Sequence, residues 1–424
     1  MLLMFKVKNY MSFREEAILD MRATSYVQHP SHVISVNERL RLLKMTVLYG
    51  ANASGKSNFI SAMFFFERYI FSQFFQSGRM ESDISEENTV SLRLPLRLQP
   101  FALADKGNDE SEFEIIFLHG GKMFQYGFVC SPKKIQSEWF YIDDQKVFER
   151  EEQKLSFGKQ YKDELKDYNK IPVERLYLSV LDYFLEEAPK EQLLGEFTAF
   201  FKNDFHVFTE IFFDPSVKNF GAMVGLSNEL IENNLFRAKV EQYLRAIDIG
   251  IKRLDVQTET ILREDTGKKE ERHIIRTVHD VYDEAGNLTG EKLFDLPQES
   301  GGTLRFLSYI QRMLEVIEQG GVLIVDELSA KLHPLLTNLI VDLFCSSKNH
   351  QAQLIFTTHD ISLLTRRRRR DEIVFVEKNA RGESSLYSLS DLKVREDASF
   401  GKDYLQGKYG AIPVFHTDEL FGGE

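Results

Sequence analysis

The stretch Gly50-Ala51-Asn52-Ala53-Ser54-Gly55-Lys56-Ser57 fits the pattern G-x-x-x-x-G-K-[ST]. A short apolar run at 45–49 precedes it, and apolar residues at helical spacing follow Ser57, which predicts a strand, a glycine loop and a helix. In such a loop the glycines let successive N–H groups point at phosphate oxygens, and the helix adds its positive N-terminal end. Lys56 then neutralises the β and γ oxygens, and the Ser57 hydroxyl faces Mg²⁺. The sequence thus predicts an α/β fold that binds ATP and Mg²⁺.

A second segment, Val322-Leu323-Ile324-Val325-Asp326-Glu327, is apolar until it ends in two carboxylates, as a buried parallel strand can. We expect this strand to lie beside the strand that feeds the glycine loop. Asp326 would then reach the Mg²⁺ shell, and Glu327 would polarise the attacking water as the general base. The alternative is a strand that merely ends in solvated acids.

Two further segments add polar groups to this picture. Ser300, Gly301 and Gly302 open a helix shortly before the second strand, so they form either an anion site or a plain N-cap. His359 ends another apolar strand, 32 residues after Glu327 (359 − 327). That spacing favours a contact with the γ-phosphate over a purely structural histidine.

Composition limits the classes of protein and partner. The 424 residues are enough for two or three domains, or for one domain with a large insertion. The net charge of −12 argues against a broad basic surface for nucleic acid. Cys130 and Cys345 are far apart, which indicates buried core thiols in a reducing cytosol. No run is long and apolar enough for a membrane span, and the N-terminus has the pattern of a strand. We expect a soluble, cytoplasmic protein that does not contact membranes.

Periodicity predicts the order of the elements. Strands are expected at 2–9, 15–21, 45–49, 113–118, 123–130, 137–157, 322–325, 353–357 and 372–377. Helices are expected across 160–248, most clearly at 226–247 with a serine cap, and at 302–319 and 334–347. A β region with a turn at 284–288 fills 251–296. The predicted division is a core of 1–75 and 298–424, a β-rich part at 76–158, a helical insertion at 159–250 and a β hairpin region at 251–297.

The glycine loop, the Ser300 segment, the carboxylate pair and His359, in this order, resemble the ABC-type ATPase head. They are similar to the branch that includes SMC-like, RecF-like and overcoming-lysogenization-defect-like ATPases. The segment Lys6-Val-Lys-Asn9-Tyr-Met-Ser12-Phe13 also resembles the first strand of that branch. Other segments of the sequence are similar to the RloA/AbiLi group of ATP-binding proteins from bacterial anti-phage abortive-infection loci. These segments are residues 28–30, 332–336, 370–378, 386–391 and 404–413.

The resemblance implies a homo-dimer or higher homo-oligomer in which two heads close head-to-tail around ATP. Each ATP would contact Gly50, Asn52, Ser54, Gly55, Lys56, Ser57 and Asn58 of one subunit and Ser300, Gly301 and Gly302 of the other. Glu327 and His359 would be the catalytic pair, with His359 sensing the γ-phosphate. Mg²⁺ would be bound by Ser57, Asp326 and a Q-loop glutamine, for which Gln99 is the candidate. Thr303 and Ser329 depart from the family pattern, which often has Gln and Asp there.

Roughly 240 residues separate the first motif from the Ser300 segment, too few for long coiled-coil arms. The 65 residues after His359 are too few for a Toprim nuclease of the overcoming-lysogenization-defect type, so an effector should be another chain encoded nearby, a Toprim-like nuclease or a toxin. The sequence then predicts an ATPase switch that responds to a phage product. The alternative is a RecF-like DNA-repair ATPase that binds DNA through the five arginines at 366–370. The net charge instead favours a solvated or partner-facing loop there.

Overall fold

The structure is a computed structural model that describes residues 1–75, 97–105, 107–209, 227–247, 250–262, 269–330, 332–365, 368–395 and 398–413. The chain divides into two compact units. The first comprises Met1–Thr209, Gln319–Leu328 and Asn338–Glu424, and the second comprises Glu210–Glu318 and Ser329–Thr337. Within the described residues, no helix is long and apolar enough to cross a lipid bilayer.

A six-stranded sheet forms the centre of the first unit, in the order β11-β15-β16-β5-β17-β18. Its strands are β11 (Phe205–Phe208), β15 (Gly321–Val325), β16 (Ala352–Thr357), β5 (Met45–Tyr49), β17 (Ile373–Lys378) and β18 (Ser384–Ser388). All neighbours run parallel except β17 and β18. Every residue of β5, β15 and β16 is buried, as expected for parallel strands covered on both faces. The carboxyl ends of these strands therefore meet at one edge of the sheet.

The order of these strands corrects one prediction. β15 is not the neighbour of β5, because β16 pairs with both of them: Phe356 lies opposite Val325 on one side and Val47 on the other. The six buried residues of β16 suit a central position better than an edge position. The last residue of β16, Thr357, is thereby placed between the glycine loop and the two carboxylates.

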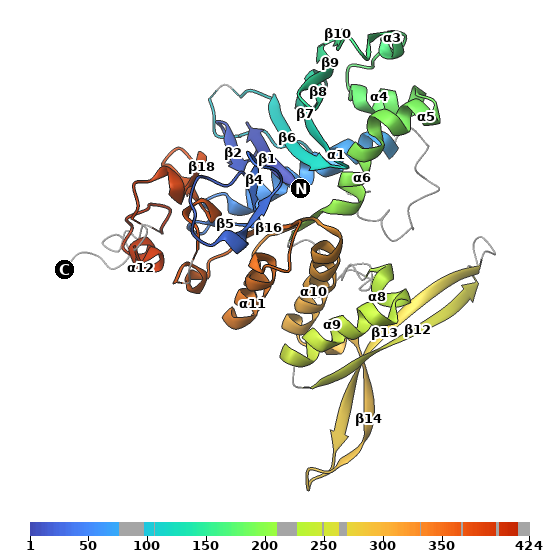
Figure 1. The fold of residues 1–424 in the computed structure, drawn as a ribbon, viewed down its shortest axis with the longest axis vertical. Helices are drawn as coiled ribbons and strands as arrows, with labels where there is room; N and C mark the ends of the chain where they lie inside the picture. The colour runs from blue at the N-terminus through green and yellow to red at the C-terminus, as the bar shows by residue number, and fades with distance from the viewer. Residues whose placement is uncertain are drawn as a thin grey trace. The chain divides into compact units, whose positions relative to one another are not determined.

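A seven-stranded antiparallel sheet, in the order β10-β9-β8-β7-β6-β1-β2, completes the framework of the first unit (Figure 1). It contains β1 (Leu2–Lys8), β2 (Ala17–Asp20), β6 (Ser111–His119), β7 (Lys122–Cys130), β8 (Ile135–Ile142), β9 (Gln145–Glu151) and β10 (Lys154–Phe157), each of which the sequence predicted. The helix α1 (Lys56–Phe75) follows the glycine loop, and its aromatic residues pack on this sheet. Phe66 lies 5.7 Å from Phe5 and 5.4 Å from Phe128, measured between ring centroids. The abundant phenylalanines thus fill the core beneath the loop.

The segment between β10 and β11 is mostly helical, as predicted. It contains α3 (Lys162–Leu165), α4 (Tyr177–Phe184), α5 (Glu187–Lys190), α6 (Glu196–Ala199) and two π-helical turns at Glu191–Gly195 and Phe200–Asp204. The strand β11 inside this region was not predicted, nor were β18 and the short pair β3 (Val33–Ser35) and β4 (Arg41–Leu43). Each has five residues or fewer, so its strand character comes from pairing with a neighbouring strand more than from its own pattern. Cys130 and Cys345 are buried and free, as predicted.

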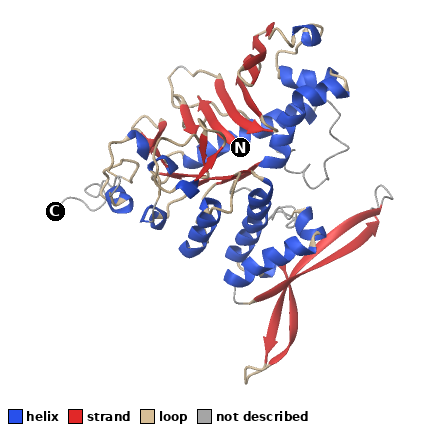
Figure 2. Cartoon of the chain, viewed as in Figure 1, coloured by secondary structure: helices blue, strands red, loops and turns tan. Residues whose placement is uncertain are grey.

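The second unit contains a three-stranded sheet of long strands (Figure 2). These are β12 (Ile251–Leu262), β13 (Lys269–Tyr282) and β14 (Leu288–Asp295), followed by α10 (Gly301–Gln319). The helix expected at 226–247 is divided into α8 (Asn228–Glu232) and α9 (Asn234–Ile247). Ser227 caps the first by accepting from Leu230 N, and Asn233 caps the second by accepting from the N–H groups of Leu235 and Phe236. The other α-helices in the described part of the chain are α11 (Pro334–Cys345) and α12 (Phe400–Leu405).

Glu67 makes the stability of the first unit dependent on pH. It is buried on α1, and desolvation raises the pKa of its carboxyl from 4.5 to about 7, which Arg68 offsets only in part. A folded-state pKa above the unfolded value means that stability is fully present below about pH 4.5 and falls as pH rises through about 7. Glu67→Gln should remove this loss and stabilise the protein above pH 7 by up to about 3 kcal/mol.

Melting temperatures of the parent and of Glu67→Gln at pH 5 and pH 8 measure this effect. Glu15→Gln, at an exposed position, is the matched control and should keep the parent's pH dependence. If Glu67→Gln loses as much stability between pH 5 and pH 8 as the parent does, the raised pKa is not the cause of the pH dependence.

Candidate functional site

The glycine loop is held in a conformation that its two glycines alone allow. A Cβ atom on Gly50 would lie 2.2 Å from the carbonyl oxygen of Val376, and one on Gly55 would lie 2.4 Å from Ser384 Oγ. Gly55 also has a φ of 115°, which L side chains rarely adopt. Both sites therefore require glycine, which explains the spacing of the motif in this chain.

Lys56 is buried inside the loop that it follows. Its Nζ donates to the carbonyl oxygens of Gly50 at 2.9 Å and Ala51 at 3.1 Å. Burial lowers the pKa of the Lys56 ammonium, and the carboxylates of Glu327 and Asp326 partly oppose this shift. Among the described residues, only neutral carbonyls contact this buried cation directly, which suits it to bind phosphate oxygens that supply the opposite charge.

The hydroxyl of Ser54 also fits a phosphate ligand. It is buried, and no hydrogen-bond partner for its Oγ exists among the described residues. A buried polar atom without a partner costs about 1–3 kcal/mol, so it marks a place where a ligand supplies the bond. The loop thus combines a close-packed backbone, an ammonium and an unpaired hydroxyl, which is a donor set that suits the phosphates of ATP.

Asp326, Ser57 and Thr357 meet at the edge of the sheet. Ser57 Oγ donates to Asp326 Oδ1 at 3.1 Å, and Thr357 Oγ1 donates to the same oxygen at 2.7 Å. Thr357 Oγ1 in turn accepts from the backbone N–H of Glu327 at 2.7 Å. The hydroxyl–carboxylate pair of Ser57 and Asp326 is an oxygen donor set of the kind that Mg²⁺ prefers. Sequence analysis missed Thr357, although it lies two residues before His359.

Glu327 and His359 contact each other, with His359 Nε2 3.0 Å from Glu327 Oε1. Glu327 has a φ of 52°, a left-handed conformation that costs a non-glycine residue about 1–3 kcal/mol. Its neighbours hold this turn, because Asp326 N donates to Phe208 O and Leu328 N donates to Thr357 O. The strained turn directs the Glu327 side chain from the end of β15 to the histidine that follows β16.

Three other predicted residues lie in the first unit. Asn58 Nδ2 donates to Ser12 Oγ at 2.7 Å, and the Ser12 hydroxyl lies 2.8 Å from Ser384 Oγ, which donates to Ser54 O. Asn58 therefore takes part in a polar network that supports the loop. The side chains of Asn52 and Gln99 are exposed, and the carbonyl oxygen of Gln99 accepts from Met11 N, next to Ser12. Ligand binding by Asn52 and Gln99 stays a prediction.

Ser300, Gly301 and Gly302 belong to the second unit, at the start of α10. Ser300 Oγ accepts from Thr303 N at 3.0 Å and lies 2.8 Å from Thr303 Oγ1. Ser300 is thus the N-cap of the helix, and Thr303, which departs from the family pattern, fixes its hydroxyl. The N–H groups of the first turn have no acceptor within the helix, so an N-cap and an anion site are compatible here.

The arginine run is neither a solvated loop nor a DNA groove where the structure describes it, at Arg368, Arg369 and Arg370. Arg369 is fully buried: it forms two hydrogen bonds with Asp371, at 2.9 and 2.7 Å, and donates to the carbonyl oxygens of Tyr26 and Gln28. Arg368 is also buried, which corrects the expectation of exposure. Arg366 and Arg367 lie outside the described residues.

Arg370 completes this contact between distant parts of the sequence. Its guanidinium lies over the ring of Tyr26, 3.9 Å from the centroid, and donates to Val394 O. The segments at 26–28 and 368–372 overlap two of the pieces that carried the abortive-infection resemblance. Both segments therefore take part in one contact within the first unit.

Two other places in the first unit could hold a ligand. His32, Cys345 and Glu372 place their potential metal-binding atoms within 4.8 Å of one another. Glu372 already contacts His32 Nδ1 at 2.8 Å and Arg369 N at 3.0 Å, and burial raises the pKa of the Cys345 thiol well above its usual value. Because the thiol is neutral and the carboxylate already has hydrogen-bond partners, we interpret this cluster as part of the core and not as a metal site.

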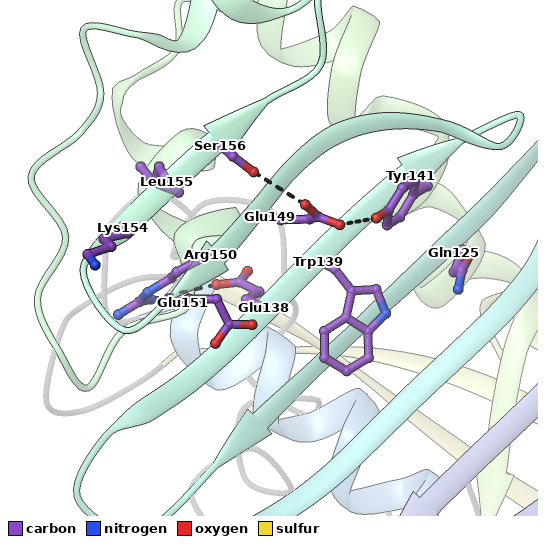
Figure 3. Close-up of a pocket in the computed structure, with 10 residues that line it drawn as sticks. All are labelled: Gln125, Glu138, Trp139, Tyr141, Glu149, Arg150, Glu151, Lys154, Leu155 and Ser156. Carbon is purple, nitrogen blue, oxygen red and sulfur yellow. Dashed lines mark hydrogen bonds and ion pairs between the residues drawn. The ribbon is translucent and has the colours of Figure 1, made fainter.

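The second place is a cavity of about 710 Å³ against β7 to β10 (Figure 3). It is bordered by Gln125, Glu138, Trp139, Tyr141, Glu149, Arg150, Glu151, Lys154, Leu155 and Ser156. Glu149 accepts hydrogen bonds from Tyr141 and Ser156, and the fully buried Arg150 and Glu138 lie 3.7 Å apart. The carboxylates outnumber the cations, so this cavity does not suit phosphates.

The parallel sheet, the glycine loop at its carboxyl edge and the inserted mixed α/β region form an ABC-type P-loop ATPase head, the fold class that the sequence predicted. A family model described as "AAA domain, putative AbiEii toxin, Type IV TA system" matches residues 45–365, and the chain belongs to this family. A comparison with curated proteins gave no match.

Solved structures of SMC heads are similar to the chain at 13% identity. One is titled "Crystal structure of the SmcHead bound to the C-winged helix domain of ScpA" (TM-score 0.46; 91% of this chain and 97% of that chain are covered). Another is an SMC head domain from Thermotoga maritima (0.38; 93% and 99%). A third is an SMC head with an extended coiled coil bound to the C-terminal domain of ScpA from Pyrococcus furiosus (0.42; 91% and 96%).

Thr357→Val tests the hydroxyl that joins the Asp326 carboxylate to the backbone N–H of Glu327. The variant keeps the volume but removes the hydroxyl that accepts from Glu327 N and donates to Asp326, so kcat for ATP should fall by about tenfold or more while ATP still binds. Thr46→Val, which removes a buried hydroxyl from β5 whose contact is the sulfur of Met21, is the control and should keep kcat. Steady-state phosphate release measures both, and equal rates for the two variants would contradict the role of Thr357.

Proposed function

We propose that the chain is an ATP-hydrolysing switch that dimerises head-to-tail around ATP and controls a separate effector in bacterial anti-phage defence. The observation that carries the proposal is the continuous network of Ser57, Asp326, Thr357, Glu327 and His359 beside the Lys56 loop. A scaffold that only held nucleotide would need neither a general base nor a strained turn to orient it. The network therefore favours hydrolysis.

Each residue has a defined task in this proposal. Lys56 and the loop N–H groups bind the β- and γ-phosphates of ATP, and Ser57 and Asp326 hold Mg²⁺, with Gln99 as the proposed third ligand. Mg²⁺ supplies charge neutralisation at the phosphates when bound. Glu327 accepts a proton from the attacking water, and His359 links that carboxylate to the γ-phosphate position. The contact with His359 holds the Glu327 carboxylate in place for this task.

The proposed dimer completes the site, because Ser300, Gly301 and Gly302 of a second copy would offer their helix N-terminus to the γ-phosphate. ATP then holds two heads together, and hydrolysis releases them. The output of the protein is a change of assembly, for which hydrolysis is the timer.

The link to defence comes from two sources. The family description names an abortive-infection toxin and a type IV toxin–antitoxin system, and the sequence resembles the RloA/AbiLi group. We propose a Toprim-like nuclease or toxin encoded nearby as the effector, and a phage product as the trigger. Direct DNA binding is disfavoured, because Arg369 and Arg370 are engaged within the fold and the net charge is −12.

Lys56→Ala should abolish tight ATP binding, because the buried loop then lacks the cation that neutralises the phosphates. Isothermal titration with ATP and Mg²⁺ measures the affinity, which should fall by about a hundredfold or more. Lys8→Ala, at an exposed position, should bind like the parent. Unchanged affinity in Lys56→Ala would overturn the phosphate-loop assignment.

Glu327→Gln should bind ATP but hydrolyse it at least about a hundredfold more slowly, because an amide cannot accept the proton of water at neutral pH. The ATP-bound dimer should then persist and be visible by size-exclusion chromatography with light scattering. Hydrolysis at the parent rate would show that another residue is the base. Absence of an ATP-dependent dimer would refute the dimer mechanism.

A further inference from the structure

Glu299 stands one residue before the Ser300 segment, and β13 holds its side chain. Glu299 Oε1 lies 2.7 Å from His279 Nε2 and accepts a hydrogen bond from Thr277 Oγ1. The carboxylate is nearly buried, with 8% of the side chain exposed, and Thr277 is 1% exposed. A carboxylate that is buried with two donors at hydrogen-bond distance is fixed in direction as well as in position.

The loop that carries Glu299 is fastened to the same sheet a second time. β14 ends at Asp295, whose carboxylate accepts from Arg276 Nε of β13 at 2.8 Å and whose N–H donates to Gln298 Oε1 at 2.8 Å. Glu299 N then donates to Leu296 O at 3.0 Å. Covalent continuity with β14 and the side-chain bonds to β13 together leave the backbone of Ser300 little freedom.

Charge gives the second reason for this arrangement. A carboxylate beside the first turn of α10 would repel a phosphate that approaches the helix N-terminus. The hydrogen bonds to Thr277 and His279 direct the carboxylate into β13. His279 is itself packed against Phe294 of β14, with 4.6 Å between the ring centroids, so the imidazole is also held in place.

We infer that Glu299 is a positioning residue, held by His279 and Thr277, that sets the Ser300–Gly301–Gly302 backbone for the γ-phosphate bound by a second copy of the chain. This inference rests on the proposed function. It assigns the three-stranded sheet a role in the ATPase cycle: the sheet fixes the geometry of the segment that closes the site.

The test compares Glu299→Ala, Glu299→Gln and His279→Phe with Glu291→Gln, alone and in the Glu327→Gln background. Glu291 forms an exposed ion pair with Lys252 and Arg253 in the same sheet and is the matched control. Fluorescent-ATP titration at low protein concentration reports the affinity of a single head. Phosphate release gives kcat, and light scattering after ATP removal gives the lifetime of the trapped dimer.

We expect Glu299→Ala and His279→Phe to lower kcat about tenfold and to shorten the dimer lifetime similarly, with single-head ATP affinity within twofold of the parent. Glu299→Gln should keep part of the activity, because its amide oxygen still accepts from Thr277. The double variant Glu299→Ala/His279→Phe should lose no more than Glu299→Ala alone, because Glu299→Ala already removes the contact with His279.

Three outcomes distinguish a failure of the Glu299 inference from a failure of the proposed function. An unchanged kcat and dimer lifetime in Glu299→Ala, with a normal dimer in Glu327→Gln alone, refutes the inference and leaves the proposed function standing. A loss of kcat accompanied by an equal loss of single-head ATP affinity and of thermal stability also refutes it, since that is the result of a merely structural contact. No ATP-dependent dimer in Glu327→Gln alone refutes the proposed function itself.

Discussion

The parallel pairing of β16 with β5 on one side and β15 on the other is the constraint on which the nucleotide site depends. Parallel pairing brings the carboxyl ends of all three strands to one edge, so the glycine loop, the carboxylate pair and the histidine need no long connections to meet. Thr357 ends the middle strand, and its hydroxyl reaches both Asp326 and the backbone of Glu327. A change in strand order would separate every one of these groups.

The site also balances strain and charge across that edge. Glu327 adopts a left-handed backbone conformation, which backbone hydrogen bonds from both neighbouring strands maintain. Lys56 loses solvation inside the loop, and two carboxylates partly compensate for it. Backbone strain and a buried cation both lower the stability of a fold, and their coincidence at one edge is typical of a functional site.

The sequence predicted most strands and long helices because their apolar patterns are local. It predicted Gly50 to Ser57 and Asp326 to Glu327 because spacing alone defines those motifs. It could not reveal the position of β16 or the four-residue β11, since strand order depends on pairing between residues far apart in the chain. Arg369 was misjudged because five adjacent charges indicate solvent, while Asp371 and two carbonyl oxygens satisfy it in the interior. Thr357 and the Glu299–His279 contact were invisible for the same reason: each depends on a partner that only folding supplies.

The place where β13 contacts Glu299 has a mechanical consequence. Glu299 is bonded to Thr277 and His279, which lie five and three residues before the carboxyl end of β13 at Tyr282. At the far end of the hairpin, Tyr282 and Leu288 face each other across the strands and are exposed. A load applied at this end of the hairpin therefore acts, through the hydrogen bonds of Thr277 and His279, on Glu299, two residues before α10 begins.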